Sequence, residues 1–172
     1  YHLYVLHQGQ RFDRVRYFTT GAVCFRREES YKPLQRQWSF RMREIVCFGT
    51  LQEVRAFLEQ SRRDIERIAS ALSIGLGWQQ ATDPFFDPMR NASFLMQKVD
   101  PVKMEMVFRD ELAIGSMNLH RQHFGTAFQI ERDGEPVHSA CVAFGMERWL
   151  FALLQIFGTR YELWPLPLPV NS

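Results

Sequence analysis

The chain has 172 residues, of which 46% are apolar, and its formal net charge is +2 at pH 7. This length and apolar content exclude a disordered chain and predict a single domain over residues 1–172. The charge is too small to indicate nucleic-acid binding by itself. No apolar run approaches the roughly 20 residues that cross a bilayer, and no secretory signal pattern is present. Neither a membrane partner nor an exported protein is therefore expected.

The first half of the chain is typical of a long hairpin followed by a long helix. Residues 1–6 alternate weakly, which predicts a short strand, and residues 8–14 are polar and loop-like. Two further strands are predicted over 17–26 and 38–49, joined by a loop over 27–37. Thr50 is a suitable N-cap for a helix, and Gly75 and Gly77 are expected to end it. Its apolar residues recur at helical spacing: Leu51, Val54, Phe57, Leu58, Ile65, Ile68 and Leu72.

The second half alternates mainly between strands and turns. Residues 83–88 hold two prolines and predict a turn-rich connection. Strands are predicted over 102–109, 113–119, 126–131 and 137–144, with a turn at Asp133-Gly134 and a helix over 147–157. The tail from Trp164 contains Pro165, Pro167 and Pro169 and is expected to be irregular. No internal repeat is present. The sum is an α+β fold, with an antiparallel sheet of about six strands and few helices.

Two arginine-bearing junctions carry the chemistry of this sequence. Arg26 and Glu28 close the first strand of the hairpin and project from one face, where a guanidinium can clamp a phosphate. The return strand brings an aromatic, which can stack on a base, and a second carboxylate. Near the other end, Gly145-Met146-Glu147-Arg148 places a second arginine where a strand passes into a helix. Together the two junctions indicate a nucleotide site and favour ATP chemistry.

These segments, in this order, resemble the catalytic core of class II aminoacyl-tRNA synthetases, the seryl type in particular. Residues 25–28 with the hairpin to Glu44 look like motif 2 of that class, and residues 145–148 look like motif 3. The chain is still more similar to the amino acid:[carrier protein] ligases, which are truncated homologues of the seryl enzymes. The shared stretches are Ser39 to Glu44, Asp83 to Phe86, His120 to Gly125, and His138 to Cys141 leading into motif 3.

The resemblance implies an adenylate-forming ligase with a class II antiparallel sheet flanked by helices. Such enzymes activate a small amino acid (glycine or alanine first) with ATP and Mg²⁺. They then pass it to the phosphopantetheine thiol of a carrier protein, without tRNA. By resemblance, Arg26 holds the α-phosphate and Arg148 the γ-phosphate, both as catalytic residues, while Glu28 holds the adenine amino group and Phe40 stacks on the ring. Glu105 is similar to an acidic residue that contacts the substrate amine.

The family also binds zinc through Cys, Glu and Cys, with the substrate amine or a water as fourth ligand. Glu44 and Cys141 match two of these positions as metal and substrate ligands, and the first cysteine would fall just before Tyr1. Cys24 is the alternative within the chain. Motif 1, which builds the family's homodimer, would also lie upstream of Tyr1. Ala143 stands where motif 3 usually has glycine, which predicts some crowding of the nucleotide.

Simpler interpretations of the same residues remain open. Arg26 and Glu28 can form a surface ion pair, Cys141 can be a core thiol, and Lys103 with Glu105 can be one polar strand face. His120 and His123 are spaced like metal ligands on a helix, although their setting favours a strand end and a turn. Three cysteines do not make a disulfide framework, which favours a reducing cytoplasm. Two rival functions also remain: a tRNA-charging seryl-type fragment, and a synthetase-derived module without catalysis.

Overall fold

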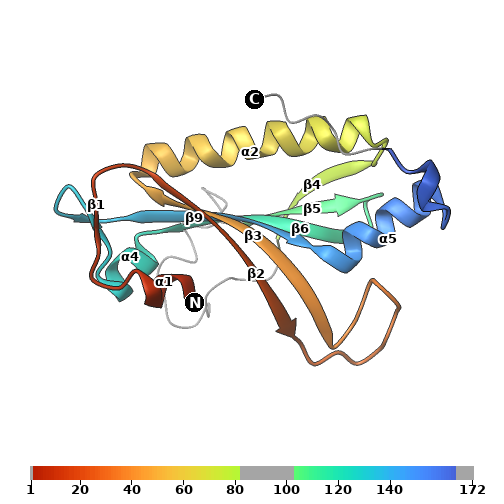
Figure 1. Ribbon diagram of the computed structural model, residues 1–172, viewed down its shortest axis with the longest axis horizontal. Coiled ribbons are helices and arrows are strands. Elements are labelled where there is room, and N and C mark those ends of the chain that lie inside the picture. Colours follow the sequence, from red (N-terminus) through yellow and green to blue (C-terminus); the bar gives the residue numbers. More distant parts are fainter. Residues whose placement is uncertain (1, 82–102, 166–172) are drawn as a thin grey trace.

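A computed structural model describes residues 2–81 and 103–165. Six strands in these residues form one antiparallel sheet in the order β2-β3-β9-β6-β5-β4 (Figure 1). The predicted α+β class and the antiparallel sheet of about six strands are confirmed. The strands are β2 (Arg16–Phe25), β3 (Ser39–Gly49), β4 (Leu76–Gln80), β5 (Lys103–Phe108), β6 (Leu112–Arg121) and β9 (His138–Gly145).

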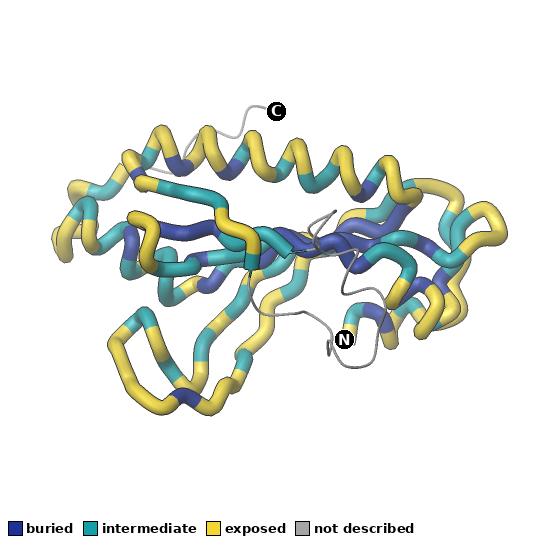
Figure 2. The backbone as a smooth tube through the Cα atoms, turned by 180° about the vertical axis from the view of Figure 1, so that it is seen from behind, coloured by how far each residue is buried: buried dark blue, intermediate teal, exposed yellow. Residues whose placement is uncertain are grey.

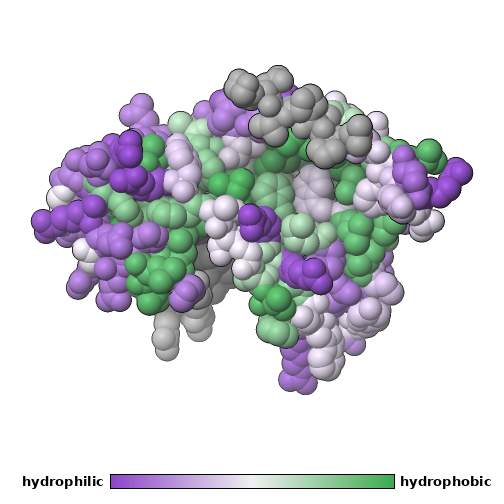
Figure 3. All heavy atoms as spheres, viewed as in Figure 1, coloured by the Kyte–Doolittle hydropathy of each residue, from purple (hydrophilic) through white to green (hydrophobic). Residues whose placement is uncertain are grey.

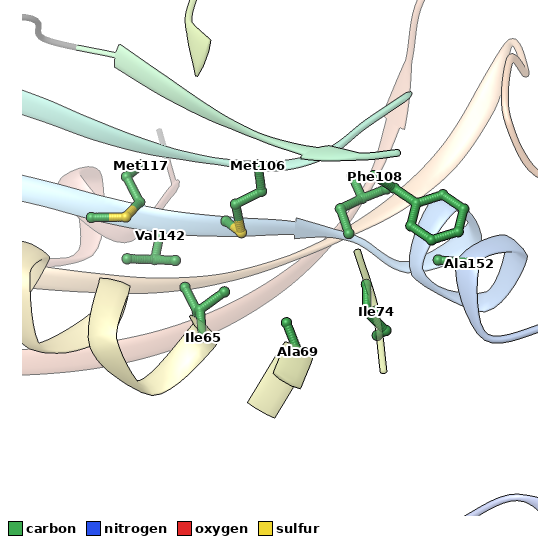
Figure 4. Packing of buried hydrophobic residues seen from close by; sticks show 9 residues of the cluster. Ile65, Ala69, Ile74, Met106, Phe108, Met117, Val142 and Ala152 are labelled. Carbon is green, nitrogen blue, oxygen red and sulfur yellow. The ribbon is translucent and has the colours of Figure 1, made fainter. Parts of the chain in front are cut away.

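Two helices share the larger hydrophobic core with the sheet. The long helix α2 (Leu51–Ala71) runs along the sheet, and α5 (Met146–Phe157) follows directly from β9. Figure 4 shows Ile65 and Ala69 of α2 pointing toward Met106, Met117 and Val142 of the strands. Thr50 caps α2 with a complete capping box, in which its side chain and that of Glu53 each bond the other's backbone N–H. The predicted N-cap is confirmed.

A second, aromatic core forms around the short helices α1 (His2–Leu6) and α4 (His123–Phe128). Tyr4 stacks on Phe124 at 4.1 Å between ring centroids and on Phe48 at 5.3 Å. A small sheet closes this end, made of β1 (Arg11–Phe12), β7 (Glu131–Arg132) and β8 (Glu135–Pro136). The turn at Asp133-Gly134 joins β7 to β8, as predicted.

Two predicted strands are wrong, and the strands β1, β4 and β8 were not predicted. Residues 2–6 are the helix α1, because burying Tyr4 among aromatic rings outweighs a weak alternation. Residues 123–128 are the helix α4. Its Gly125 packs against Val137, the residue before β9, so closely that an added Cβ would stand 2.2 Å from the Val137 carbonyl oxygen. Of the predicted 126–131 strand only Glu131 pairs, as part of β7. Finally, α2 ends at Ala71, and Gly77 lies inside the unpredicted strand β4.

The remaining boundaries, including those of β6, agree with the predicted ones to within one or two residues. A short 3₁₀ turn, η1 (Tyr161–Leu163), follows α5. The predicted turn at 83–88 lies outside the described residues, as do Pro167 and Pro169.

The β2–β3 hairpin extends past the helices that cover the rest of the sheet. Its far end is exposed along much of its length, whereas the centre of the sheet is buried (Figure 2). In the space-filling view the hairpin stands out from the body, with hydrophilic and hydrophobic residues mixed on its surface (Figure 3). The base of this projection, next to the start of α5, is where the predicted site residues are found.

Candidate functional site

A cavity of about 170 Å³ lies between the hairpin and the junction of β9 with α5. It brings together four predicted site residues from four elements: Arg26 after β2, Phe40 on β3, Glu105 on β5 and Arg148 on α5. The other lining residues are Leu34, Gln35, Gln37, Met42, Ala113, Ile114, Gly115, Ser116, Gly145 and Glu147. Side chains that are up to 122 positions apart in the chain (Arg26 to Arg148) thus share one cavity.

Arg26, Glu28 and Arg36 form a linked group at the hairpin end of the cavity. Arg26 Nε donates to Glu28 Oε1 at 2.6 Å, and Arg36 Nη1 donates to Glu28 Oε2 at 2.8 Å. Burial raises the pKa of the Glu28 carboxyl, but the two guanidinium groups outweigh this and hold the pKa below its ordinary value. The Arg26 guanidinium also lies 5.4 Å from the centroid of the Phe40 ring. The predicted Arg26–Glu28 pair therefore exists, and Arg36 belongs to it.

Arg148 joins the hairpin loop to the centre of the sheet. Its Nε donates to the carbonyl oxygen of Gln35 at 2.8 Å, and its Nη1 donates to that of Ala113 at 2.6 Å. Gly145 is the residue before α5, so Arg148 lies in the first turn of the helix, as predicted. A guanidinium carries five N–H groups, so three donors remain for a ligand.

Two guanidinium groups line the cavity, and a third, that of Arg36, lies close beside it. Burial lowers the pKa of Arg148 most, and the charges of Arg26 and Arg36 lower it further, against the opposing effects of Glu28 and Glu105. Three guanidinium groups therefore lie within electrostatic range of one another. Guanidinium groups bind phosphate oxygens in bidentate geometry, and their repulsion is relieved by an anion. The arrangement is suited to a polyphosphate.

Strand register places the remaining predicted residues on the same face of the sheet. One row of directly paired residues crosses five strands and consists of Glu105, Ser116, Ala143, Glu44 and Thr20. The next row consists of Lys103, Asn118, Cys141, Val46 and Phe18. Because paired residues share a face and alternate residues return to it, Glu44 and Cys141 are diagonal neighbours on the side that holds Glu105 and Ser116.

Ala143 occupies the middle of the first row and not the nucleotide end. It pairs with Glu44 on one side and with Ser116 on the other, while Gly145 lines the cavity beside Arg148. The backbones of Gly115 and Ala143 approach closely here, since a Cβ on Gly115 would stand 2.5 Å from the Ala143 carbonyl oxygen. The methyl group of Ala143 therefore belongs to the floor between Glu44 and Ser116. The expectation that Ala143 crowds the nucleotide finds no support in this position.

Lys103 and Glu105 lie two positions apart on β5 and form an ion pair on one face of the strand. The Lys103 ammonium lies 3.1 Å from a Glu105 carboxylate oxygen, and both side chains are partly exposed. The polar strand face expected for this pair is observed, and Glu105 still reaches the cavity wall. The contact of Glu105 with a substrate amine remains a prediction.

Cys141 is buried in a polar cluster. Asn118 Nδ2 donates to the Cys141 sulfur at 3.3 Å and to Ser116 Oγ at 3.1 Å, and His120 Nε2 lies 3.6 Å from the same sulfur. Burial raises the pKa of the Cys141 thiol to about 12, with a smaller contribution from Glu44, and lowers the pKa of His120 to about 4. Without a bound ion, the Cys141 thiol and the His120 imidazole are therefore both neutral at pH 7. The sulfur is not surrounded by apolar side chains alone, as a simple core thiol would be.

Glu44 is a half-buried carboxylate without a side-chain partner in the part of the chain that the structure describes. Burial raises the pKa of this carboxyl. Its charge in turn raises the pKa of both Cys141 and Cys24, after the larger effect of burial, so the three groups are within electrostatic range. Nevertheless, residues 2–81 and 103–165 contain no group of three His, Cys, Asp or Glu side chains arranged to hold a metal ion.

The two predicted zinc ligands, Glu44 and Cys141, are of residue types that bind zinc. A cysteine sulfur with nearby N–H donors and an unpaired carboxylate lie on one sheet face, which is the ligand type that zinc prefers. Neither Cys24 nor His123 completes a metal group with them in the described residues. His120 contacts Cys141, and the spacing of His120 and His123 does not build a site on a helix, because His120 belongs to β6.

Three residues of the site were missed from the sequence. Arg36 lies in the segment predicted to be a loop, where an arginine eight positions after Glu28 is the available signal. Ser116 and Asn118 alternate on one strand inside an apolar run, where Asn118 is buried and Ser116 is half-buried. Only strand register could assign them to the face that holds Cys141.

Comparison with known proteins agrees with this geometry. The model of the family "tRNA synthetase class II core domain (G, H, P, S and T)" matches residues 14–157. The chain belongs to this family. It is 42% identical over 163 residues to amino acid–[acyl-carrier-protein] ligase 1 of Bradyrhizobium diazoefficiens, covering 91% of this chain and 48% of that protein. It is 28% identical over 144 residues to a type-2 serine–tRNA ligase of Methanococcus maripaludis, covering 78% of this chain and 28% of that protein.

Solved structures show the same class II fold. The crystal structure of M. kandleri SerRS in complex with A. aeolicus tRNASec superposes with a TM-score of 0.78 at 20% identity. The match covers 96% of this chain and 35% of the other. This chain thus spans about half the length of the curated ligases that it matches. None of the helices in residues 2–81 and 103–165 has the length and hydropathy needed to span a membrane.

Proposed function

We propose that the chain is the catalytic domain of an adenylate-forming ligase. It activates a small amino acid with ATP and transfers it to the phosphopantetheine thiol of a carrier protein. One observation carries the first half of this proposal: Arg26 and Arg148 line a single cavity with the aromatic ring of Phe40 in its wall, and Arg36 lies beside them on Glu28. The second half is supported by the 42% identity to a protein named amino acid–[acyl-carrier-protein] ligase.

ATP binding would redistribute contacts that already exist. The Arg26 guanidinium lies over Phe40 and pairs with Glu28, the two side chains proposed to bind the adenine. The base would take the place of Arg26 on the ring, which frees Arg26 for the α-phosphate. Glu28 would exchange an arginine contact for the adenine amino group. Arg148 would direct its three remaining N–H donors to the γ-phosphate while Gln35 and Ala113 hold it in place.

The reaction then proceeds in two displacements. An oxygen of the amino-acid carboxylate attacks the α-phosphorus, and the bond to the bridging oxygen breaks, so pyrophosphate leaves with its electron pair. Arg26 stabilises the charge that develops on the α-phosphate. In the second step the carrier thiolate attacks the carbonyl carbon, and AMP leaves. A thiolate is a competent nucleophile toward an adenylate without a dedicated base.

The substrate amine would be held at the opposite end of the site face, by Glu105 and by a zinc ion. Glu44 and Cys141 would be two of the zinc ligands, and the third predicted cysteine would precede Tyr1. Zinc supplies direct coordination of the free amine, which distinguishes an amino acid from other small carboxylates. Mg²⁺ would accompany the triphosphate. We further propose a homodimer through residues upstream of Tyr1, and a reducing compartment, in keeping with three free cysteines.

A carrier protein is the preferred acceptor because of charge. Binding a tRNA backbone depends on many phosphate contacts, and a net charge of +2 leaves few basic residues to spare. The rival function is charging of tRNA, favoured by the 28% identity to a type-2 serine–tRNA ligase. The other rival, a module without catalysis, is disfavoured by the presence of Arg26, Glu28 and Arg148 around one site.

The test is an acceptor assay after an activation assay. ATP–pyrophosphate exchange is measured with each amino acid, and we expect glycine or alanine to support it. The protein, ATP and the labelled amino acid are then incubated with holo-carrier protein or with tRNA. Label on the carrier supports the proposal, and label on tRNA alone supports the synthetase. If no amino acid supports exchange, both enzymatic functions are contradicted and a module without catalysis is favoured.

A further inference from the structure

One backbone N–H of the β2–β3 hairpin has its hydrogen-bond partner outside the sheet. The amide nitrogen of Arg41, on β3, donates to Glu147 Oε2 at 2.9 Å, and Glu147 belongs to the first turn of α5. This turn lies beside β3 at the base of the projecting hairpin (Figure 1). Arg41 stands between Phe40 and Met42, whose side chains both line the cavity. The contact therefore joins α5 to the strand that supplies one wall of the site.

Strand pairing explains why this N–H needs a partner. Arg26 donates its backbone N–H to the Trp38 carbonyl oxygen at 2.9 Å, and bonded and non-bonded pairs alternate along an antiparallel ladder. The Val23–Arg41 pair lies three pairs further along and is therefore non-bonded, so the Arg41 N–H points away from β2. On its other side β9 has already ended, because the chain turns into α5 one pair earlier. The Glu147 carboxylate supplies the acceptor that a longer β9 would have supplied.

Glu147 puts a negative charge in the wall of a cavity that is proposed to hold a triphosphate. It lines this cavity together with Arg26 and Arg148, and its side chain is 19% exposed. Like charges repel, so the charge of Glu147 does not by itself favour ATP. Its ion pair with the Arg41 guanidinium is long, at 3.8 Å, and the Arg41 side chain is 77% exposed, so this pair contributes little. The strong contact of Glu147 is the short bond from the backbone N–H.

The next residue of α5, Arg148, holds the other side of the cavity. Its guanidinium donates to the carbonyl oxygen of Gln35 in the hairpin loop and to that of Ala113 on β6. Glu147 accepts from the backbone of β3, while Arg148 donates to the backbone of the loop and of β6. Two consecutive side chains in one turn of α5 thus connect three segments that surround the cavity.

We propose that Glu147 is a positioning residue for ATP binding, which acts through the Arg41 N–H and the backbone of β3. It fixes the Phe40 ring, the surface proposed to stack on the adenine, relative to Arg148, which is proposed to hold the γ-phosphate. Glu147 itself contacts neither the base nor the phosphates. The inference rests on the proposed function, because it assigns the residue that keeps the same ATP site in shape.

The experiment measures ATP affinity of the complete protein in two ways. The KM for ATP is taken from pyrophosphate exchange, and the Kd of a non-hydrolysable ATP analogue is taken from calorimetry. Glu147→Ala removes the acceptor, and we expect KM and Kd to rise about 10-fold, as for the loss of one hydrogen bond to a charged group, with the KM for the amino acid unchanged. Glu147→Gln keeps a side-chain oxygen that accepts the N–H, so it should recover most of the affinity.

Arg41 supplies a matched pair of variants. Arg41→Ala removes the exposed side chain and keeps the N–H, so it should bind ATP like the wild type. Arg41→Pro removes the N–H but no bond to β2, because that N–H points away from β2. It should reproduce the effect of Glu147→Ala, and the two changes combined should weaken ATP binding little further than either one.

Thermal unfolding of each variant separates loss of ATP affinity from loss of fold. If either Glu147→Ala or Arg41→Pro does not fold, the other decides the test. Wild-type affinity in the folded variants would overturn the proposal. Equal weakening in Glu147→Gln and Glu147→Ala would also overturn it, since that is the pattern of a carboxylate that binds Mg²⁺ directly.

Wild-type exchange distinguishes the inference from the proposed function. No exchange with any amino acid contradicts the proposed function, and the calorimetric Kd then still tests the role of Glu147. Exchange by the wild type, together with an unchanged Kd in Glu147→Ala, contradicts the inference alone.

Discussion

The two halves of β3 show how one strand serves both the core and the site. From Val46 to Gly49 every residue is buried, because the aromatic core around α1 and α4 covers one face and α2 covers the other. From Ser39 to Ile45 exposed residues alternate with half-buried ones, and the half-buried side chains include Phe40 and Glu44. Where helices cover both faces, the strand contributes stability. Where it extends past them, one face is left for a ligand (Figure 2).

Replacing Phe48 and Phe40 separately is the most direct test of this division of β3. Phe48→Ala removes a side chain that is 1% exposed, and we expect it to lower the free energy of unfolding by about 3–5 kcal/mol. Phe40→Ala should cost less than about 1 kcal/mol, because its ring faces the cavity and packs on Arg26. It should instead raise the KM for ATP. Chemical denaturation and pyrophosphate exchange on both variants measure this, and equal losses of stability would contradict the division of β3.

The arginines test the same division on the side of activity. We expect Arg26→Ala and Arg148→Ala each to reduce amino-acid-dependent pyrophosphate exchange by at least about 100-fold, as when transition-state electrostatics are lost. Arg67→Ala is the matched control, because Arg67 is an exposed residue of α2 paired with Asp64 at 3.4 Å and should leave exchange unchanged. Wild-type exchange in either cavity variant would end the assignment of the two arginine junctions.

The smallest expected effect is on the stability of the fold at acid pH, through the Glu28 carboxyl. Its pKa is lower in the folded chain than in the unfolded chain, so the Arg26 and Arg36 pairs stabilise the fold above the unfolded pKa. This contribution is lost as the pH falls through the folded pKa. In Glu28→Gln the loss cannot occur, and the dependence of stability on pH below about 4.5, the ordinary carboxyl value, should be flatter. Denaturation curves of both proteins from neutral to acid pH measure the difference, and parallel curves would contradict the role of the pair.

Local pattern was enough to predict most of the fold. The period of α2, its Thr50 cap and the alternation of the central strands were readable, because each depends on residues close together in the chain. The helices α1 and α4 were not readable. Their residues are helical because Tyr4, Phe124 and Phe48 stack across elements far apart in sequence, and no local period reports that contact.

The site was partly predictable for the same reason. Arg26, Glu28 and Arg148 stand in short motifs, and the structure brings Arg26 and Arg148 to one cavity, with Glu28 paired to Arg26 beside it. Asn118 stands in no motif, and His120 stands in a shared stretch that does not indicate its contact with Cys141. Their connection to Cys141 comes from the pairing of β6 with β9, which only the assembled sheet supplies. The Arg36 contact depends on how the hairpin loop folds back on Glu28.

Strand pairing fixes the position of each site residue in the sheet, whatever the distance between these residues along the chain. Extra residues in a connecting loop therefore leave these positions unchanged. A single residue inserted within β3 is different, because it turns every following side chain to the opposite face. Inserted after Gly49 it leaves the register of β3 unchanged, but inserted before Phe40 it would bring Arg41 and Arg43 into the places of Met42 and Glu44. Insertion scanning should therefore outline the catalytic face as sharply as any set of substitutions, with tolerance changing from one residue to the next at each strand end.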